Sequence, residues 1–177
     1  MRYDDEINDP EIQYQSRSKQ CIALALALTY YFRFPTAEDN LQRNDTQTPT
    51  REELDQLLSN IIPEFSDMIE QELERFINTN NFVFPEEVAI NQAVREHIFL
   101  IVVSIATRTP LCIIGESGQS KTLSFQIVLQ NLQGVQLSMK TFCKRLPAID
   151  PFFCLGSKYI RAEDIAHVFE RHVRREQ

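Results

Sequence analysis

The pattern of apolar and polar positions predicts that the first part of the chain is helical. Residues 16–34 are apolar around most of a helix circumference, so this helix must be buried against another element. Residues 36–50 are polar, lack periodicity and predict a loop. A capping box of Thr50 and Glu53 predicts a helix over 51–60. Two more helices are expected, from 63 to 78 and from Pro85 to about 107. The apolar face expected for helix 63–78 comprises Phe65, Met68, Ile69, Leu73, Phe76 and Ile77.

The second part of the chain alternates between short apolar runs and helical patterns. Residues 111–114 form an apolar run between Pro110 and Gly115, which predicts a buried strand, and a helix is expected over 121–132. Weaker strands are expected at 135–138 and 151–155. The fold class predicted is therefore α/β, a partial P-loop NTPase domain with parallel strands, preceded by an α-helical region. A final helix over 161–175 is expected to turn Ile165, Val168, Phe169 and Val173 inward.

The distribution of glycine indicates a candidate ligand-binding site. The chain has only four glycines, and two of them, Gly115 and Gly118, fall within residues 115–122. This segment reads Gly-Glu-Ser-Gly-Gln-Ser-Lys-Thr, and the P-loop (Walker A) pattern is G-x-x-x-x-G-K-[ST]. Every fixed position fits except Ser120, which stands where the second fixed glycine is expected. A serine there is costly if the backbone needs a positive φ, although its hydroxyl could also contact phosphate.

Each residue type in this segment has a role in binding a nucleotide. Backbone N–H groups of the loop would bind phosphate oxygens, and the helix that begins near Lys121 adds the positive end of its dipole. Lys121 would reach the β and γ phosphates, and the hydroxyl of Thr122 would ligate Mg²⁺. The predicted cofactors are therefore ATP and Mg²⁺. The residues expected to bind them are Gly115, Glu116, Ser117, Gly118, Gln119, Ser120, Lys121 and Thr122.

A hydrolytic P-loop enzyme also needs an acidic residue at the end of a second apolar strand, to orient Mg²⁺ and water. The nearest candidate after the loop is Asp150, but Pro147 interrupts the apolar run before it and Pro151 follows it, so we interpret it as a chance match. We therefore expect the chain to end before the domain does, and we expect it not to hydrolyse ATP by itself.

Charge, hydropathy and cysteine content limit the classes of partner and the cellular location that the chain can have. A formal net charge of −7 argues against a nucleic-acid or membrane-surface binder, because both need a basic face. No apolar run reaches the roughly 20 residues that cross a bilayer, and the acidic N-terminus is unlike a secretory signal. The cysteines are widely spaced, which indicates buried free thiols in a reducing compartment rather than a zinc site. We expect a cytoplasmic protein.

Residues 91–122 resemble a known family. This stretch, NQAVREHIFLIVVSIATRTPLCIIGESGQSKT, looks like the giant ubiquitin ligase mysterin, whose tandem AAA-type units include a P-loop similar to G-x-P-G-x-S-K-S. Serine before the lysine, as at Ser120, is then a family trait. The departures are Ser117, where the family has proline, and Thr122 in place of serine. The resemblance extends from about residue 21 to residue 171 and is strongest over 88–132.

The resemblance implies a division of the chain. Residues 1–35 would be the helical tail of a preceding unit and 36–50 a linker. Residues 51–107 would lead into the ATPase unit, and 108–177 would be the N-terminal half of a P-loop AAA+ domain. It also implies neighbouring AAA units as partners, and a longer parent with ATPase and ubiquitin-transfer activity. The family's ubiquitin-transfer chemistry depends on cysteine-rich zinc modules, which this sequence does not contain.

Two functions stay open on the sequence. The first is a segment that binds Mg-ATP in a mysterin-like AAA+ ATPase and E3 ubiquitin ligase. The second is a non-catalytic scaffold, in which the P-loop is structural and residues 51–107 form an interaction surface. A generic P-loop kinase or an isolated ATPase is a weaker third reading.

Overall fold

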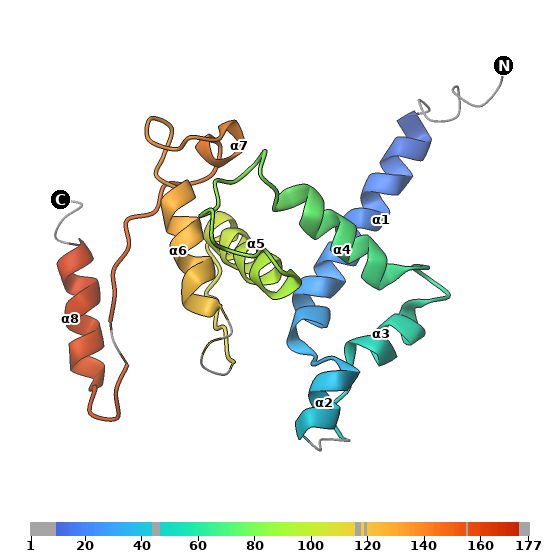
Figure 1. Ribbon diagram of the computed structural model, residues 1–177, viewed down its shortest axis with the longest axis horizontal. Coiled ribbons are helices and arrows are strands. Elements are labelled where there is room, and N and C mark those ends of the chain that lie inside the picture. The colour runs from blue at the N-terminus through green and yellow to red at the C-terminus, as the bar shows by residue number, and fades with distance from the viewer. Residues whose placement is uncertain (1–9, 44–46, 116–117, 119, 155, 174–177) are drawn as a thin grey trace.

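The structure is a computed structural model that describes residues 10–43, 47–115, 118, 120–154 and 156–173. Every regular element in these residues is helical (Figure 1). The elements are α1 (Pro10–Thr29), η2 (Tyr31–Arg33), α2 (Ala37–Arg43), α3 (Arg51–Leu58), α4 (Phe65–Phe76), α5 (Gln92–Thr107), α6 (Lys121–Asn131), α7 (Thr141–Lys144) and α8 (Ala162–Val173).

The predicted α/β class with parallel strands is wrong for this chain, because its described residues contain no strand. Residues 111–114 and 151–154 have no regular structure, 135–137 form a turn, and Leu155 lies outside the described residues. A strand is stabilised by backbone hydrogen bonds to a neighbour, and no described segment pairs with 111–114. Ile114 is consequently 90 % exposed rather than buried. Apolar composition alone did not distinguish a strand from an exposed extended segment.

Helix boundaries follow local capping chemistry. The predicted capping box is present, since Glu53 N–H donates to the Thr50 hydroxyl and the Glu53 carboxylate accepts from Thr50 N–H. The helix expected from Pro85 begins only at Gln92, where the side chain of Asn91 accepts from Val94 N–H. It ends at Arg108, whose φ of 54° stops the helix. The expected loop over 36–50 contains α2, and the first helix already begins at Pro10.

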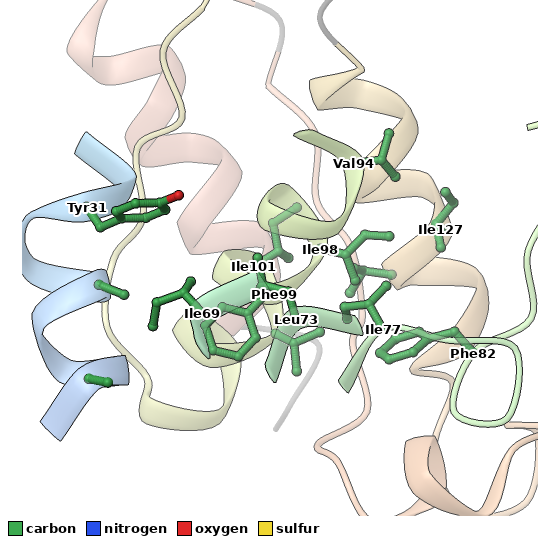
Figure 2. Close-up of a cluster of buried hydrophobic side chains, with 14 of the residues drawn as sticks. Tyr31, Ile69, Leu73, Ile77, Phe82, Val94, Ile98, Phe99, Ile101 and Ile127 are labelled. Atoms are coloured by element: carbon green, nitrogen blue, oxygen red, sulfur yellow. The ribbon is translucent and has the colours of Figure 1, made fainter. Parts of the chain in front are cut away.

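The hydrophobic core lies between α1, α4, α5 and α6 (Figure 2). The helices α4 and α5 are in contact, and each contributes apolar side chains to this core. The predicted face of α4 is confirmed at Phe65, Ile69, Leu73 and Ile77. The helix α1 is buried through only one side, at Ala23 and Ala27. The other fully buried core side chains are Phe82, Val94, Ile98, Val102, Ile127, Val128, Leu132 and Cys143.

Aromatic rings extend this core toward α7. The ring of Phe76 meets those of Phe99 and Phe142 edge to face, with centroids 5.3 and 4.9 Å apart. Phe82 lies 5.8 Å from Phe142. Such pairs contribute about 0.5–1.5 kcal/mol each beyond the area they bury. They join α4, α5 and α7 although these elements are far apart in the sequence.

A buried ion pair joins α3 to α5. Arg51 donates two parallel hydrogen bonds to the Glu96 carboxylate, at 2.7 and 2.8 Å, and the two side chains are only 16 % and 10 % exposed. The Nε of Arg51 donates to the carbonyl of Phe34 at 2.9 Å, and the Arg51 guanidinium lies 4.6 Å from the ring centre of Tyr31. Burial alone would lower the pKa of Arg51, but the hydrogen bonds and charge of Glu96 outweigh it and raise the pKa.

Two polar contacts hold the segment that precedes α5. The Asn131 side chain accepts from Val83 N–H at 2.7 Å and donates to the Val83 carbonyl at 2.8 Å. The Cys143 thiol donates to the carbonyl of Asn81 at 3.0 Å. Burial raises the pKa of the Cys143 thiol to about 11. The prediction of buried thiols holds for Cys143 only.

The other cysteines and the last helix are more exposed than predicted. Cys21, Cys112 and Cys154 are exposed. In α8, Ile165 and Phe169 are 41 % and 67 % exposed, so the inward face expected for this helix is wrong at these positions. The side chain of Val173 lies outside the described residues. Figure 1 shows α8 at the end of a long extended segment, beyond the other helices.

None of the helices in the described part of the chain has both the length and the hydropathy needed to span a membrane.

The Arg51–Glu96 pair generates a stability prediction. Glu96→Ala leaves a buried guanidinium without its carboxylate, so the free energy of unfolding should fall by about 3–5 kcal/mol in urea titration. The control Arg75→Ala removes an exposed partner of Glu72 and should cost less than about 1 kcal/mol. Replacing both members, as in Arg51→Met with Glu96→Leu, should cost less than Glu96→Ala alone. Equal effects of Glu96→Ala and Arg75→Ala would contradict this account.

Cys143 generates a second prediction. With a pKa of about 11, on the order of one thiol in a thousand is ionised at pH 8, and burial excludes the reagent as well. Iodoacetamide at pH 8 should therefore modify Cys21, Cys112 and Cys154 in the folded chain and reach Cys143 only after urea is added. Peptide mass spectrometry would show this. Rapid native modification of Cys143 would mean that α7 does not stay packed on the core.

Candidate phosphate-binding loop

The predicted P-loop connects an exposed segment to α6. Residues 111–115 run without regular structure into the loop, and α6 begins at Lys121, as the motif predicts. Gly118 has a φ of 87°, and a Cβ built on it would meet nothing within 4 Å. The loop therefore leaves open space beside its backbone, which fits the close approach of a ligand. Glu116, Ser117 and Gln119 lie outside the described residues.

Ser120 adopts the conformation for which glycine is normally used. Its φ of 56° and ψ of 9° lie in the left-handed region, which costs a residue with a Cβ roughly 1 kcal/mol. Its side chain makes no capping hydrogen bond to α6. Its carbonyl instead accepts from the backbone N–H of Ser124 at 2.8 Å and from the Ser124 hydroxyl at 2.9 Å. The sequence raised the possibility that Ser120 occupies a position of positive φ. The structure has Ser120 in that conformation.

Lys121 closes the loop on itself. Its Nζ donates to the carbonyl of Gly115 at 2.8 Å, so the ammonium group bridges the first and last parts of the motif. Thr122 follows in the first turn of α6 and is exposed. Gly115, Gly118, Ser120, Lys121 and Thr122 are thus brought together at one end of α6. Thr122 is the residue whose hydroxyl could ligate a Mg²⁺ ion held by phosphates.

A hollow of about 730 Å³ opens beside the loop. Gly118 and Ser120 line one part of it, and the turn at Phe34 lines another. The ion pair of Arg51 and Glu96 forms part of its wall, so the contact that joins α3 to α5 also shapes this space.

His97 also lines the hollow, although the sequence analysis did not identify it as a site residue. Burial lowers its pKa below 6.5; the charge of Glu96 opposes this shift, and the charge of Lys121 adds to it. Glu96 was missed as well. The sequence signal for it is a carboxylate on the same helix face as Phe99 and Val103, three and seven positions later.

Within the described ranges, no three His, Cys, Asp or Glu side chains come together as metal ligands.

Comparison with known proteins places the chain. A family model described as the RNF213 AAA domain matches residues 87–177, a range that includes α5, the loop and α6. The chain is 31 % identical to the E3 ubiquitin-protein ligase rnf213-beta of Danio rerio over 117 residues, 64 % of its length. Over 93 residues, 51 % of its length, it is 34 % identical to a putative uncharacterized transmembrane protein of Dictyostelium discoideum.

Each of these matches spans only 2 % of the relative's length. No significant match to a solved structure was found. The family match covers residues 91–122, on which the mysterin resemblance is based. The chain therefore belongs to the RNF213 AAA domain family, in agreement with that resemblance.

Proposed function

We propose that this chain is a nucleotide-binding segment of an AAA ATPase unit and binds the phosphates of Mg-ATP through residues 115–122. The observation that carries the proposal is the pair of left-handed residues, Gly118 and Ser120, directly before a helix that begins with Lys121. A strained backbone persists where surrounding structure or function requires it. Left-handed residues in a loop before a helix can turn backbone N–H groups toward one concave space, which suits an anion.

The residues would divide the task as follows. Loop N–H groups and the first turn of α6 would bind phosphate oxygens, and Lys121 would exchange the carbonyl of Gly115 for them. Thr122 would hold Mg²⁺. The proposal covers binding and not hydrolysis, because Asp150, the acidic residue considered above, does not line the hollow beside the loop.

The relatives supply the wider context. The zebrafish relative is named as an E3 ubiquitin-protein ligase, and we propose that this chain serves as an AAA segment within a protein of that kind. Neighbouring AAA units would then be its partners, and the cytoplasm its location. Ubiquitin transfer would belong to other parts of such a protein.

One observation favours the scaffold alternative. Lys121 already bonds to Gly115, so the loop holds a closed shape through its own atoms. In a scaffold this contact would serve a structural role, and α5 and α6 would pack in the same way without nucleotide.

Lys121→Ala separates these two functions. Losing hydrogen bonds to a charged group costs about 1.5–3 kcal/mol, so Mg-ATP should bind 10- to 100-fold more weakly by calorimetry. Lys144→Ala removes the same charge from an exposed position in α7 and should leave the affinity unchanged. No binding of Mg-ATP by the folded unmutated chain would sink the proposal and favour the scaffold.

Ser120→Gly tests the strain in the loop. Glycine adopts a φ of 56° without the Cβ penalty, so the free energy of unfolding should rise by about 0.5–1 kcal/mol. Ser124→Ala, which keeps the backbone bond to Ser120 but removes the hydroxyl bond, should lower stability instead. Urea titration would measure both. A loss of stability in Ser120→Gly would show that the loop does not hold this residue at positive φ.

A further inference from the structure

A small apolar hollow opens among α1, α4, α5 and α7, and it shares no lining residue with the hollow beside the loop. Its volume is about 230 Å³, and apolar atoms form most of its surface. Leu24 and the rings of Phe76, Phe99 and Phe142 line it. Pockets for drug-sized ligands are larger, at roughly 300–1,000 Å³. One large apolar side chain is therefore the size of group that this apolar hollow can hold.

A second hollow, of about 520 Å³, adjoins the apolar hollow along α4, because Glu72 and Arg75 line both. Most of its lining residues between Glu64 and Arg75 fall three or four positions apart, so they share one helix face. The opposite wall is α1, which packs against α4 (Figure 1). Gln20 of α1 lines the second hollow, and Leu24, about one turn later, lines the apolar one. The two hollows together form the α1–α4 groove.

Carboxylates dominate the charge of the α1–α4 groove. The second hollow is lined by one basic side chain and four acidic ones: Arg75, Glu64, Asp67, Glu72 and Glu74. Glu72 pairs with Arg75 at 3.1 Å, and Glu74 pairs with Arg95 of α5 at 3.5 Å. Among the described residues, no basic side chain forms an ion pair with Glu64 or Asp67. The groove thus offers two carboxylates to a cationic partner, beside a space for one apolar side chain.

This combination determines the kind of partner that fits. Peptide and protein partners are commonly held by an apolar anchor in a pocket, while charged pairs at the rim set the partner's orientation. A purely apolar ligand would use only the apolar hollow, and a simple polycation would use only the carboxylates. A second copy of this chain is disfavoured, because each copy carries a formal net charge of −7.

We propose that the α1–α4 groove binds a basic partner peptide, whose one large apolar side chain enters the apolar hollow while its Lys or Arg residues pair with Glu64 and Asp67. Asp67 precedes Phe76 by about 13 Å along the axis of α4, at 1.5 Å per residue. The basic residues of a helical peptide should therefore lie two to three turns from its apolar anchor. The inference is independent of the phosphate site, because residues 115–122 do not line this groove.

The test uses a labelled helical peptide of alanine, with lysines in one turn and a single phenylalanine about two and a half turns away. Its fluorescence anisotropy is measured as the full 177-residue chain is added. Replacing the phenylalanine of the peptide by alanine should weaken binding at least about tenfold, the effect of burying one large apolar side chain. Replacing the lysines by glutamates should abolish binding, and added salt should weaken the binding of the lysine peptide.

Charge substitutions in the chain locate the basic end of the peptide. Glu64→Gln combined with Asp67→Asn should weaken binding of the lysine peptide about two- to tenfold, the effect of two exposed ion pairs. Glu86→Gln combined with Glu87→Gln removes the same charge from exposed residues that line neither hollow, and should leave binding unchanged.

A size substitution locates the apolar end. Leu24→Trp should fill the apolar hollow, so the peptides with phenylalanine and with alanine should then bind equally weakly. Ile22→Trp adds the same ring to α1 at a position that is 55 % exposed and outside the hollow, and should leave the difference between the two peptides intact. Unfolding midpoints of all variants would show that the helices remain packed.

Several outcomes would overturn the proposal. These are no binding of the lysine peptide, equal binding of the lysine and glutamate peptides, or equal effects of the two charge variants. Self-association of the chain that Leu24→Trp abolishes would make a second copy the occupant instead. A photoreactive benzoylphenylalanine at the anchor position should crosslink to α1, α4, α5 or α7, and crosslinks confined to exposed Phe153 or Phe169 would place the peptide elsewhere. Failure of the chain to bind Mg-ATP would leave this proposal standing.

Discussion

The arrangement of this chain depends on one buried ion pair. Arg51 is the first residue of α3, yet its guanidinium reaches Glu96 in α5, the carbonyl of Phe34 and the ring of Tyr31. Taking two charges out of water is costly, and bidentate geometry with a further backbone acceptor offsets that cost. The pair fixes α3 and the turn after η2 against α5. Since α5 packs on α6, it also fixes how the N-terminal helices face the loop, and the hollow exists because of this arrangement.

The helical half of the fold could be predicted because its signals are local. The capping box of Thr50 and Glu53 and the apolar face of α4 each lie within a few residues, and the structure has both. The strands could not be predicted in the same way, because a strand depends on a partner elsewhere in the chain. Ile114 is apolar and next to proline and glycine signals, but the described chain offers it no neighbouring strand. Similarly, the apolar stripe of α8 predicted burial and Phe169 is exposed.

In the candidate site, too, the residues that belong to a local motif could be predicted, and those that depend on distant contacts could not. A motif read from consecutive residues placed Gly118, Ser120 and Lys121 together, whereas a positive φ at Ser120 was raised by the sequence only as a condition and is found in the structure. Glu96 and His97 were not found, since their importance comes from contacts with residues distant in sequence. A charged or polar residue within an otherwise apolar helix was the one available signal. It marks a buried partner without saying which residue that partner is.

The amide of Asn131 has a consequence for the opposite end of its helix. It uses its oxygen for the N–H of Val83 and its nitrogen for the carbonyls of Val83 and Ile127, so a single side chain fixes the last turn of α6 in three directions. Sliding α6 along its axis by one residue, about 1.5 Å, would break both bonds to Val83 together. An α-helix is stiff along its axis, so the position of Lys121 at the other end is set by this clamp. The register of the loop is thus determined ten residues away from it.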